Sequence, residues 1–187
     1  MSNTAVHSVS VVIPVYGASA TLQQVVNEMA SFYSEQVTQG GNRYQVAEVI
    51  LVDDCGMDNS AKVIRELAIV YERVVSVWLT RNYGQHAATV AGMASSSHEW
   101  VVTMDEDGQH NPASTGALID TALLNESPLV YGRENNREPH SFFRNVTSTR
   151  VKRLALPLLI DNKNLKYFSS FRIMTGLCLR HCSTFQV

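Results

Sequence analysis

Short apolar runs alternate along the chain with longer segments in which apolar residues recur every three or four positions. The runs are rich in β-branched residues and most are bounded by proline, glycine or aspartate, which is typical of buried strands. The longer segments have the periodicity of amphipathic helices. The pattern predicts strands over 8–15, 46–52, 74–79, 100–104 and 128–131, and helices around 22–33, 60–71, 87–94 and 118–123, the second capped by Asp58 or Ser60. This alternation favours an α/β fold with a mainly parallel sheet covered by helices on both faces.

The length and composition of the chain favour one domain. Its 187 residues are 45% hydrophobic, enough for a single core, so we expect one domain over 1–187, with residues 1–7 disordered. The net charge of -2 gives no global reason to bind nucleic acid. No apolar run approaches the roughly 20 residues that span a bilayer, and no signal-peptide pattern begins the chain. With three cysteines in no framework spacing, we expect a cytoplasmic protein.

Polar side chains follow several of the predicted strands. Because the carboxyl ends of parallel strands meet at one rim of a sheet, where ligands of such folds bind, we expect a common site there. The polar residues at these strand ends are Asp53, Asp54, Arg81, Asn82, Asp105 and Asp107.

The acidic cluster after the fourth predicted strand has the spacing of a cation site. Asp105 and Asp107 are two positions apart, so on an extended segment their side chains project to the same side. Two such carboxylates suit a hard divalent cation, Mg2+ or Mn2+, which usually completes its shell with substrate phosphates. Gln109 continues the alternation as a neutral oxygen donor. The simpler alternative is an acidic turn that caps the next helix.

Three other readings of acidic or metal-binding residues are weaker. An EF-hand calcium loop fails because His110 and Gly116 stand where it needs glycine and glutamate. A haloacid-dehalogenase-like phosphatase also begins with DxDG, but such enzymes carry Thr or Val where this chain has Gln109, and they need a later acidic pair. A metal site built on Cys178, His181 and Cys182 has no evident fourth ligand.

Four segments resemble, in type, order and spacing, the motifs of the family-2 glycosyltransferases, which have the Rossmann-like GT-A fold. They are VSVVIPVYG, ILVDDCGMDNS, LTRNYGQHAATVAGM and MDEDGQHNP. Within the family, the chain resembles the polyprenyl-phosphate group typified by dolichol-phosphate mannosyltransferase, over about residues 8–175. The resemblance implies an inverting, metal-dependent transfer of sugar from a UDP- or GDP-sugar, with the metal stabilising the leaving diphosphate.

The resemblance also implies roles for individual residues. The nucleotide-binding residues would be Pro14, Val15 and Tyr16 in the base pocket, Asp53 and Asp54 on the base, Gly84 beneath the nucleotide, and Asp105. Asp105 and Asp107 would be the metal ligands, with Gln109 as the third. The phosphate-binding residues would be Arg133, Arg144 and Arg172, whose planar guanidinium groups bind phosphate oxygens in pairs. Catalysis would therefore depend on Asp105, Asp107 and Arg172.

Three features depart from the family pattern. The loop usually written VDDGS is here VDDCG, which moves the glycine to Gly56 and leaves Cys55 near the base. Ser170 stands where relatives often have an aspartate before FRLM. The chain also stops at Val187, short of the length of relatives, so it is either naturally short or a C-terminally truncated piece.

The acceptor is left open between a polyprenyl phosphate and a glycan hydroxyl. A hydroxyl needs a general base, and none is evident outside the acidic cluster, which favours the phosphate and a role in cell-envelope glycan synthesis. Arg150, Lys152 and Arg153 precede the apolar segment 154–160, which favours peripheral contact with the cytoplasmic face of a membrane, although that segment could equally pack in the core. A nucleotide-binding module without turnover is the third reading. The sequence does not indicate an oligomeric state.

Overall fold

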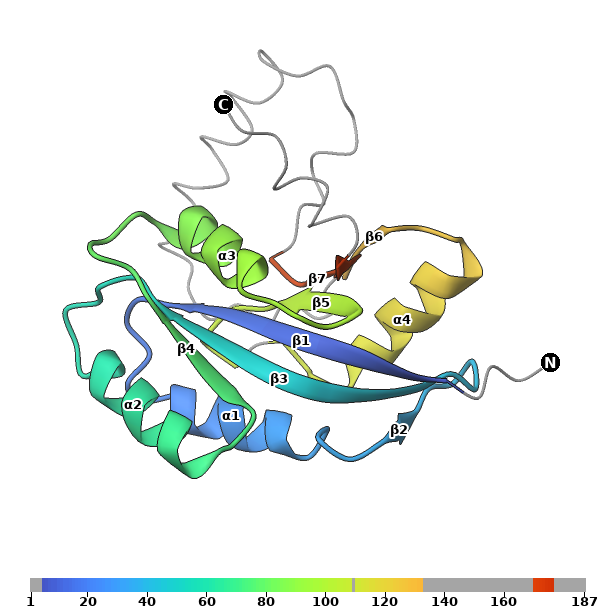
Figure 1. Ribbon diagram of the computed structural model, residues 1–187, viewed down its shortest axis with the longest axis horizontal. Coiled ribbons are helices and arrows are strands. Elements are labelled where there is room, and N and C mark those ends of the chain that lie inside the picture. Colours follow the sequence, from blue (N-terminus) through green and yellow to red (C-terminus); the bar gives the residue numbers. More distant parts are fainter. Residues whose placement is uncertain (1–4, 109, 133–169, 177–187) are drawn as a thin grey trace, which may run out of the picture. The chain divides into compact units, whose positions relative to one another are not determined.

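The computed structural model describes residues 5–108, 110–132 and 170–176, which belong to one compact unit. Its sheet contains a parallel part in which neighbouring strands follow the order β4-β3-β1-β5 (Figure 1). These strands are β1 (Val6–Val15), β3 (Arg43–Asp53), β4 (Val74–Trp78) and β5 (Trp100–Thr103). They confirm the predicted parallel strands, because each covers one of the β-branched runs.

The rest of the sheet is antiparallel. β7 (Arg172–Thr175) runs antiparallel between β5 and β6 (Leu129–Tyr131), and β2 (Gln36–Val37) pairs with the beginning of β3. The sheet is therefore mixed, with a parallel centre. β2 and β7 are absent from the predicted elements because runs of two and four residues carry little periodicity.

Helices cover both faces of the sheet, as predicted (Figure 1). They are α1 (Leu22–Ala30), α2 (Ser60–Val70), α3 (Gln85–Ala94) and α4 (Ser114–Leu124). Because side chains alternate along a strand, Val11 and Ile13 of β1 pack in a core with α1, α2 and α4, whereas Val12 packs with Ala88 of α3.

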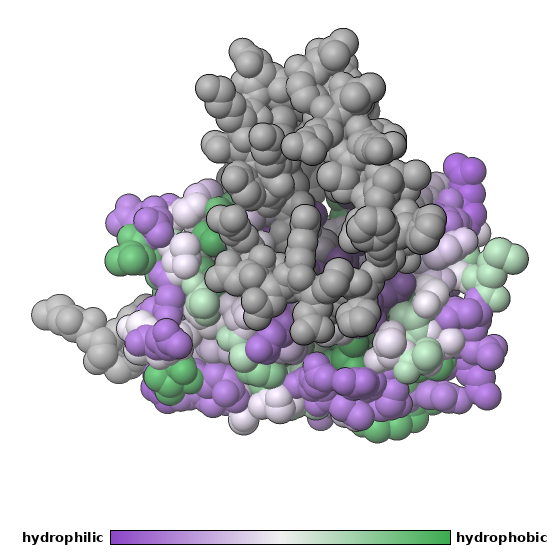
Figure 2. Space-filling view, turned by 180° about the vertical axis from the view of Figure 1, so that it is seen from behind, coloured by the Kyte–Doolittle hydropathy of each residue, from purple (hydrophilic) through white to green (hydrophobic). Residues whose placement is uncertain are grey.

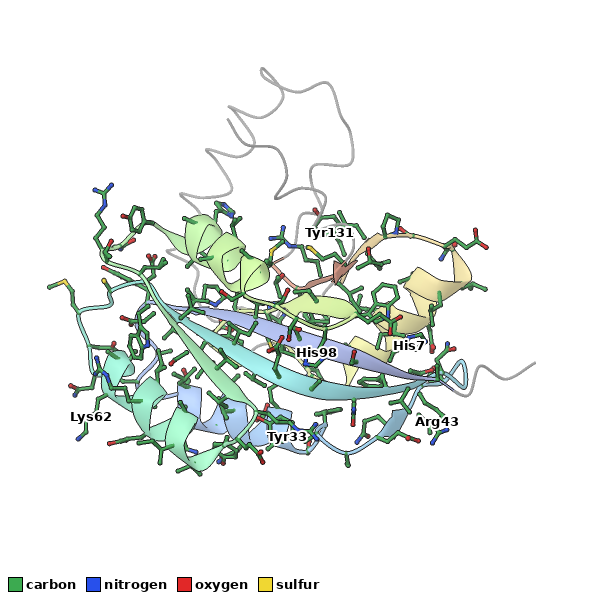
Figure 3. All side chains as sticks on the ribbon, viewed as in Figure 1. His7, Tyr33, Arg43, Lys62, His98 and Tyr131 are labelled. Carbon is green, nitrogen blue, oxygen red and sulfur yellow. The ribbon has the colours of Figure 1, made fainter. Side chains whose placement is uncertain are left out.

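Helix α2 shows how the amphipathic pattern positions an element. Ile64 and Leu67 are buried against the sheet, whereas the side chain of Lys62 is 75% exposed and points away from it (Figure 3). The N-cap is Asn59, so the prediction of Asp58 or Ser60 as the cap is wrong by one position. Asp58 still contributes, because its Oδ1 accepts a hydrogen bond from the Ser60 backbone N–H at 3.0 Å.

Hydrophilic residues occupy much of the described surface visible in Figure 2, with small hydrophobic groups between them. No helix in the described ranges combines the length and the hydropathy that crossing a bilayer requires.

The N-terminal segment corrects one prediction. Val6 and His7 pair with Arg43 and Tyr44, so the expectation of disorder over 1–7 is wrong for these two residues. The single domain over 1–187 stays a prediction. Residues 133–169 and 177–187 lie outside the described ranges, and with them the apolar segment 154–160 and the Cys178, His181 and Cys182 group.

Candidate active site

The carboxyl ends of the parallel strands form one rim, and a late segment of the chain joins it. β1 ends at Val15, which pairs with Asp53 at the end of β3. β7 begins at Arg172, which pairs with Thr103 at the end of β5 and with Tyr131 of β6 (Figure 3). β1 lies between β3 and β5, so the order of the parallel strands reverses direction beside β1. Open α/β sheets bind their ligands at such a point, outside the carboxyl ends of the strands.

Asp54 anchors the loop that leads into α3. Its Oδ1 accepts a hydrogen bond from the Tyr83 N–H at 2.7 Å, and its Oδ2 accepts one from the Gly84 N–H at 2.9 Å. Gly84 has φ of 88°, in the left-handed region that glycine tolerates best, and it is the N-cap of α3. Asp54 is only 2% exposed. Both carboxylate oxygens of Asp54 therefore stabilise the loop that precedes α3.

We therefore expect Asp54→Ala to weaken pyrophosphate and UDP or GDP to the same extent. Loss of hydrogen bonds to a charged group costs about 1.5 to 3 kcal/mol, and here the loss would fall on the loop and lower the melting temperature as well. Calorimetry with the three ligands measures the first effect. Asp54→Asn is the matched control, since it keeps one acceptor. Selective loss of UDP or GDP, with pyrophosphate and melting temperature unchanged, would instead assign Asp54 to the base.

Asp53 has an unused acceptor at the same strand end. It is 7% exposed, and its Oδ1 has no hydrogen-bond partner among the described residues. Burial raises the pKa of this carboxyl, against the lowering effects of the Cys55 backbone N–H and the positive charge of Arg65. A buried acceptor without a donor is costly, so this oxygen is suited to receive an N–H from a ligand.

The loop after β1 is held by Glu106. Its two carboxylate oxygens accept the backbone N–H groups of Tyr16 at 2.7 Å and Gly17 at 3.3 Å. Pro14 and Val15 are buried, Val15 completely, in contrast to Tyr16, which is 47% exposed. Of the three residues assigned to the base pocket, Tyr16 is the one that presents an exposed side chain.

The carboxylates of the acidic cluster have different hydrogen-bond partners. Asp105 Oδ1 accepts a hydrogen bond from Gln85 Nε2 at 2.5 Å, and its Oδ2 accepts one from Ser170 Oγ at 2.6 Å. Burial raises the pKa of Asp105, but the hydrogen bonds from His110, Ser170 and Gln85 and the charge of His110 outweigh it, so the pKa lies below its usual value. Asp105 is thus held ionised.

Glu106 differs from its neighbour in its environment. Burial raises its pKa, the N–H groups of Tyr16 and Gly17 lower it, and the charges of Asp58 and Asp105 raise it again, for a net increase. Because Glu106 reaches back to the β1 loop while Asp107 is exposed, the three carboxylates are not stacked against one another.

The predicted metal and phosphate ligands are described only in part. Asp105 and Asp107 are at the rim, whereas Gln109, Arg133 and Arg144 lie outside the described residues. In the ranges that are described, no group of three or more His, Cys, Asp or Glu side chains is arranged to hold a metal ion. Arg172 lies at the rim, and its Nε is buried without a hydrogen-bond partner in the described part of the chain.

Sequence reasoning missed three side chains that contact Asp105. They are Gln85, His110 and Ser170. Position 170 drew notice only as a departure from the family pattern. Gln85 is 20 positions from Asp105, so its contact depends on the tertiary fold, whereas His110 is only five positions away and was considered only as a mismatch to the EF-hand pattern.

Comparison with known proteins identifies the family. The model of glycosyl transferase family 2 matches residues 10–185. The chain belongs to this family. The match includes both ends of the rim, from β1 to β7, which confirms the resemblance seen in the four motifs.

Among curated family 2 relatives, two are named undecaprenyl-phosphate 4-deoxy-4-formamido-L-arabinose transferase. The protein from Aeromonas hydrophila is 35% identical over 154 residues, covering 82% of this chain and 44% of that protein. The protein from Proteus mirabilis is 35% identical over 147 residues, covering 78% and 42%. The resemblance to a polyprenyl-phosphate group is thereby confirmed, and the chain spans less than half the length of these relatives.

Two solved structures with low sequence identity to the chain have the same fold. S. aureus TarS 1-349 in complex with UDP-GlcNAc aligns with a TM-score of 0.60 at 18% identity, covering 94% of this chain and 47% of that one. The mannosyltransferase PcManGT from Pyrobaculum calidifontis, in complex with GDP-Man and Mn2+, aligns with a TM-score of 0.63 at 16% identity, covering 98% and 48%. These likenesses confirm the GT-A fold.

Proposed function

We propose that this family 2 chain carries the donor-binding site of a glycosyltransferase that moves a sugar from a UDP- or GDP-sugar to a polyprenyl phosphate at a membrane face. The observation that carries the proposal is the rim itself, where an ionised Asp105, an exposed Asp107 and the start of α3 lie together. The names of the two curated relatives support the acceptor class. The nucleotide sugars bound in the two solved structures, UDP-GlcNAc and GDP-Man, support a nucleotide-sugar donor.

The rim residues fit a hard divalent cation. An ionised carboxylate offers about four lone-pair sites. Ser170 and His110 both approach Asp105 Oδ2, whereas Gln85 alone of the described residues contacts Oδ1, which leaves a site on Oδ1. Asp105 and Asp107 would hold Mg2+ or Mn2+, with Gln109 as the third ligand suggested by its position. When bound, the ion would supply Lewis acidity toward the leaving diphosphate.

The chain's own residues account for the rest of donor binding. Asp53 would accept an N–H of the base through Oδ1, which has no hydrogen-bond partner among the described residues, in place of Asp54, whose oxygens hold the loop. The N-terminus of α3 at Gly84 would favour the negative diphosphate, and Arg172 would bind its oxygens with two N–H groups. An anionic phosphate acceptor then needs no general base, consistent with direct, inverting attack at the sugar carbon.

Ligand titration followed by a transfer assay on the same 187-residue chain tests this function. We expect UDP or GDP to bind in Mg2+ or Mn2+ and to lose affinity in EDTA, and the matching nucleotide sugar to be consumed in the presence of a short-chain polyprenyl phosphate. Transfer to a free sugar hydroxyl instead would favour a glycan acceptor. Binding without any transfer would favour a nucleotide-binding module.

A further inference from the structure

Two side chains from different segments meet at one oxygen of Asp105. Ser170, which is 65 residues further along the chain, donates its hydroxyl hydrogen to Asp105 Oδ2 at 2.6 Å. His110 Nε2 lies 3.2 Å from Ser170 Oγ and 3.4 Å from the same carboxylate oxygen. The comparisons and the family motifs assign no role to either side chain.

The three contacts have one consistent order of donors and acceptors. The hydroxyl of Ser170 has a single hydrogen, and the short distance to the ionised Asp105 assigns that hydrogen to the carboxylate. The Ser170 oxygen then accepts the Nε2–H of His110. This order makes His110 the donor to Ser170 and Ser170 the donor to Asp105, and it requires the imidazole to carry its hydrogen on Nε2.

Both donors are fixed by their surroundings. The backbone carbonyl of Ser170 accepts a hydrogen bond from Thr103 Oγ1 at 2.5 Å, at the end of β5. His110 is buried and stacks on Phe171, with 5.2 Å between ring centroids and 15° between planes. The carbonyl of Phe171 in turn accepts the Gly132 N–H at 2.9 Å. The segment that leads into β7 therefore brings Ser170 to the acidic cluster, and its Phe171 packs on His110 from the loop after β5.

We propose that Ser170 and His110 are positioning residues that fix the orientation of the Asp105 carboxylate for the divalent ion. The inference rests on the proposed function, in which Asp105 is a ligand of that ion. Ser170 holds Oδ2 and Gln85 holds Oδ1, so the carboxylate is restrained from both sides, and Oδ1 keeps a lone-pair site beside its one contact in the described residues. The neutral hydroxyl matters, because an ionised carboxylate at position 170 could not donate and would repel Asp105.

Mn2+ affinity of the wild type and of Ser170 variants tests the inference without relying on transfer activity. Mn2+ is titrated alone by electron paramagnetic resonance, and UDP and GDP are titrated by calorimetry in Mn2+ and in EDTA. Loss of an outer-shell partner typically weakens metal binding about tenfold to a hundredfold, which we expect for Ser170→Ala. Ser170→Thr keeps the hydroxyl and is expected to keep Mn2+ affinity. Nucleotide binding in EDTA should be the same in all three proteins.

Two further variants complete the comparison. His110→Phe keeps an aromatic ring against Phe171 but removes the Nε2 donor, and it is expected to weaken Mn2+ binding in the same direction by a smaller factor. Ser95→Ala removes an exposed hydroxyl at the other end of α3 and should change nothing.

Several outcomes overturn the inference. One is an unchanged Mn2+ affinity in Ser170→Ala, with or without a lower melting temperature, since that marks a purely structural role. Another is equal weakening in Ser170→Ala and Ser170→Thr. If the wild type binds Mn2+ no better than Asp105→Asn, the inference fails together with the metal assignment. If the wild type transfers no sugar but Ser170→Ala still binds Mn2+ more weakly than the wild type, the transferase function is overturned and the positioning role is upheld.

Discussion

Asp107→Asn is expected to abolish metal-dependent nucleotide binding while leaving the thermal transition nearly unchanged. Asparagine has the size of aspartate but lacks its charge, so the proposed cation site would lose one of its two anionic ligands. We expect affinity for UDP or GDP in Mg2+ to fall by about a hundredfold or more, which corresponds to roughly 2.7 kcal/mol. Stability should hold, because Asp107 is exposed and its neutralisation relieves repulsion within the cluster.

Glu106→Gln is the matched control for this prediction, because it removes one negative charge from the same cluster. Glu106 binds the Tyr16 and Gly17 N–H groups, and a glutamine oxygen can keep one of these bonds. Metal dependence should therefore survive in Glu106→Gln. Undiminished magnesium-dependent binding in Asp107→Asn, or an equal loss in both variants, would contradict the assignment of Asp107 as a ligand.

The parallel centre of the sheet was predictable because its longest strands contain continuous apolar runs, at 11–15 in β1 and 49–52 in β3. β1 and β3 are buried by helices on both faces, and a sequence without polar alternation signals that environment. β7 was not predictable in this way. It has four residues, and its partner β5 lies about 70 positions earlier in the chain, so only the tertiary fold pairs them.

The position of the rim was predictable from the sequence, but the hydrogen bonds between its residues were not. Asp53 is the last residue of β3 and Asp54 is the first residue of the loop that follows, so the two side chains have different surroundings. Which of them stays available depends on the loop at Tyr83 and Gly84, 29 and 30 residues away, whose N–H groups occupy Asp54. Sequence reasoning assigned both carboxylates to the base, whereas the described contacts place both oxygens of Asp54 on the loop before α3.

The partners of the acidic cluster were also not predictable from the sequence. Side-by-side carboxylates suggested that a cation must neutralise them. In the structure, backbone N–H groups already satisfy Glu106, and the side chains of Gln85, Ser170 and His110 satisfy Asp105. The proposed metal site therefore rests on the ionised state of Asp105 and the exposure of Asp107, not on repulsion among three carboxylates.

Gly56→Ala is expected to destabilise the chain by roughly 3 kcal/mol, the upper part of the range for overpacking. A Cβ at Gly56 would lie 1.7 Å from the Tyr16 carbonyl oxygen and 2.6 Å from its carbon, and backbone atoms cannot move aside as a flexible side chain can. The shifted glycine of VDDCG is therefore where the loops after β1 and β3 touch.

Urea unfolding measures this effect, and Gly17→Ala is its control, because a Cβ at Gly17 would meet nothing within 4 Å. Relieving the clash would push the Tyr16 loop away from the end of β3. The affinity of Gly56→Ala for nucleotide should therefore fall even without urea, where the chain stays folded. Gly17→Ala should match the wild type in both measurements. An unfolding midpoint for Gly56→Ala equal to that of Gly17→Ala would mean that the two loops are not in contact, and the rim would then lose the connection that brings Tyr16 next to Asp53.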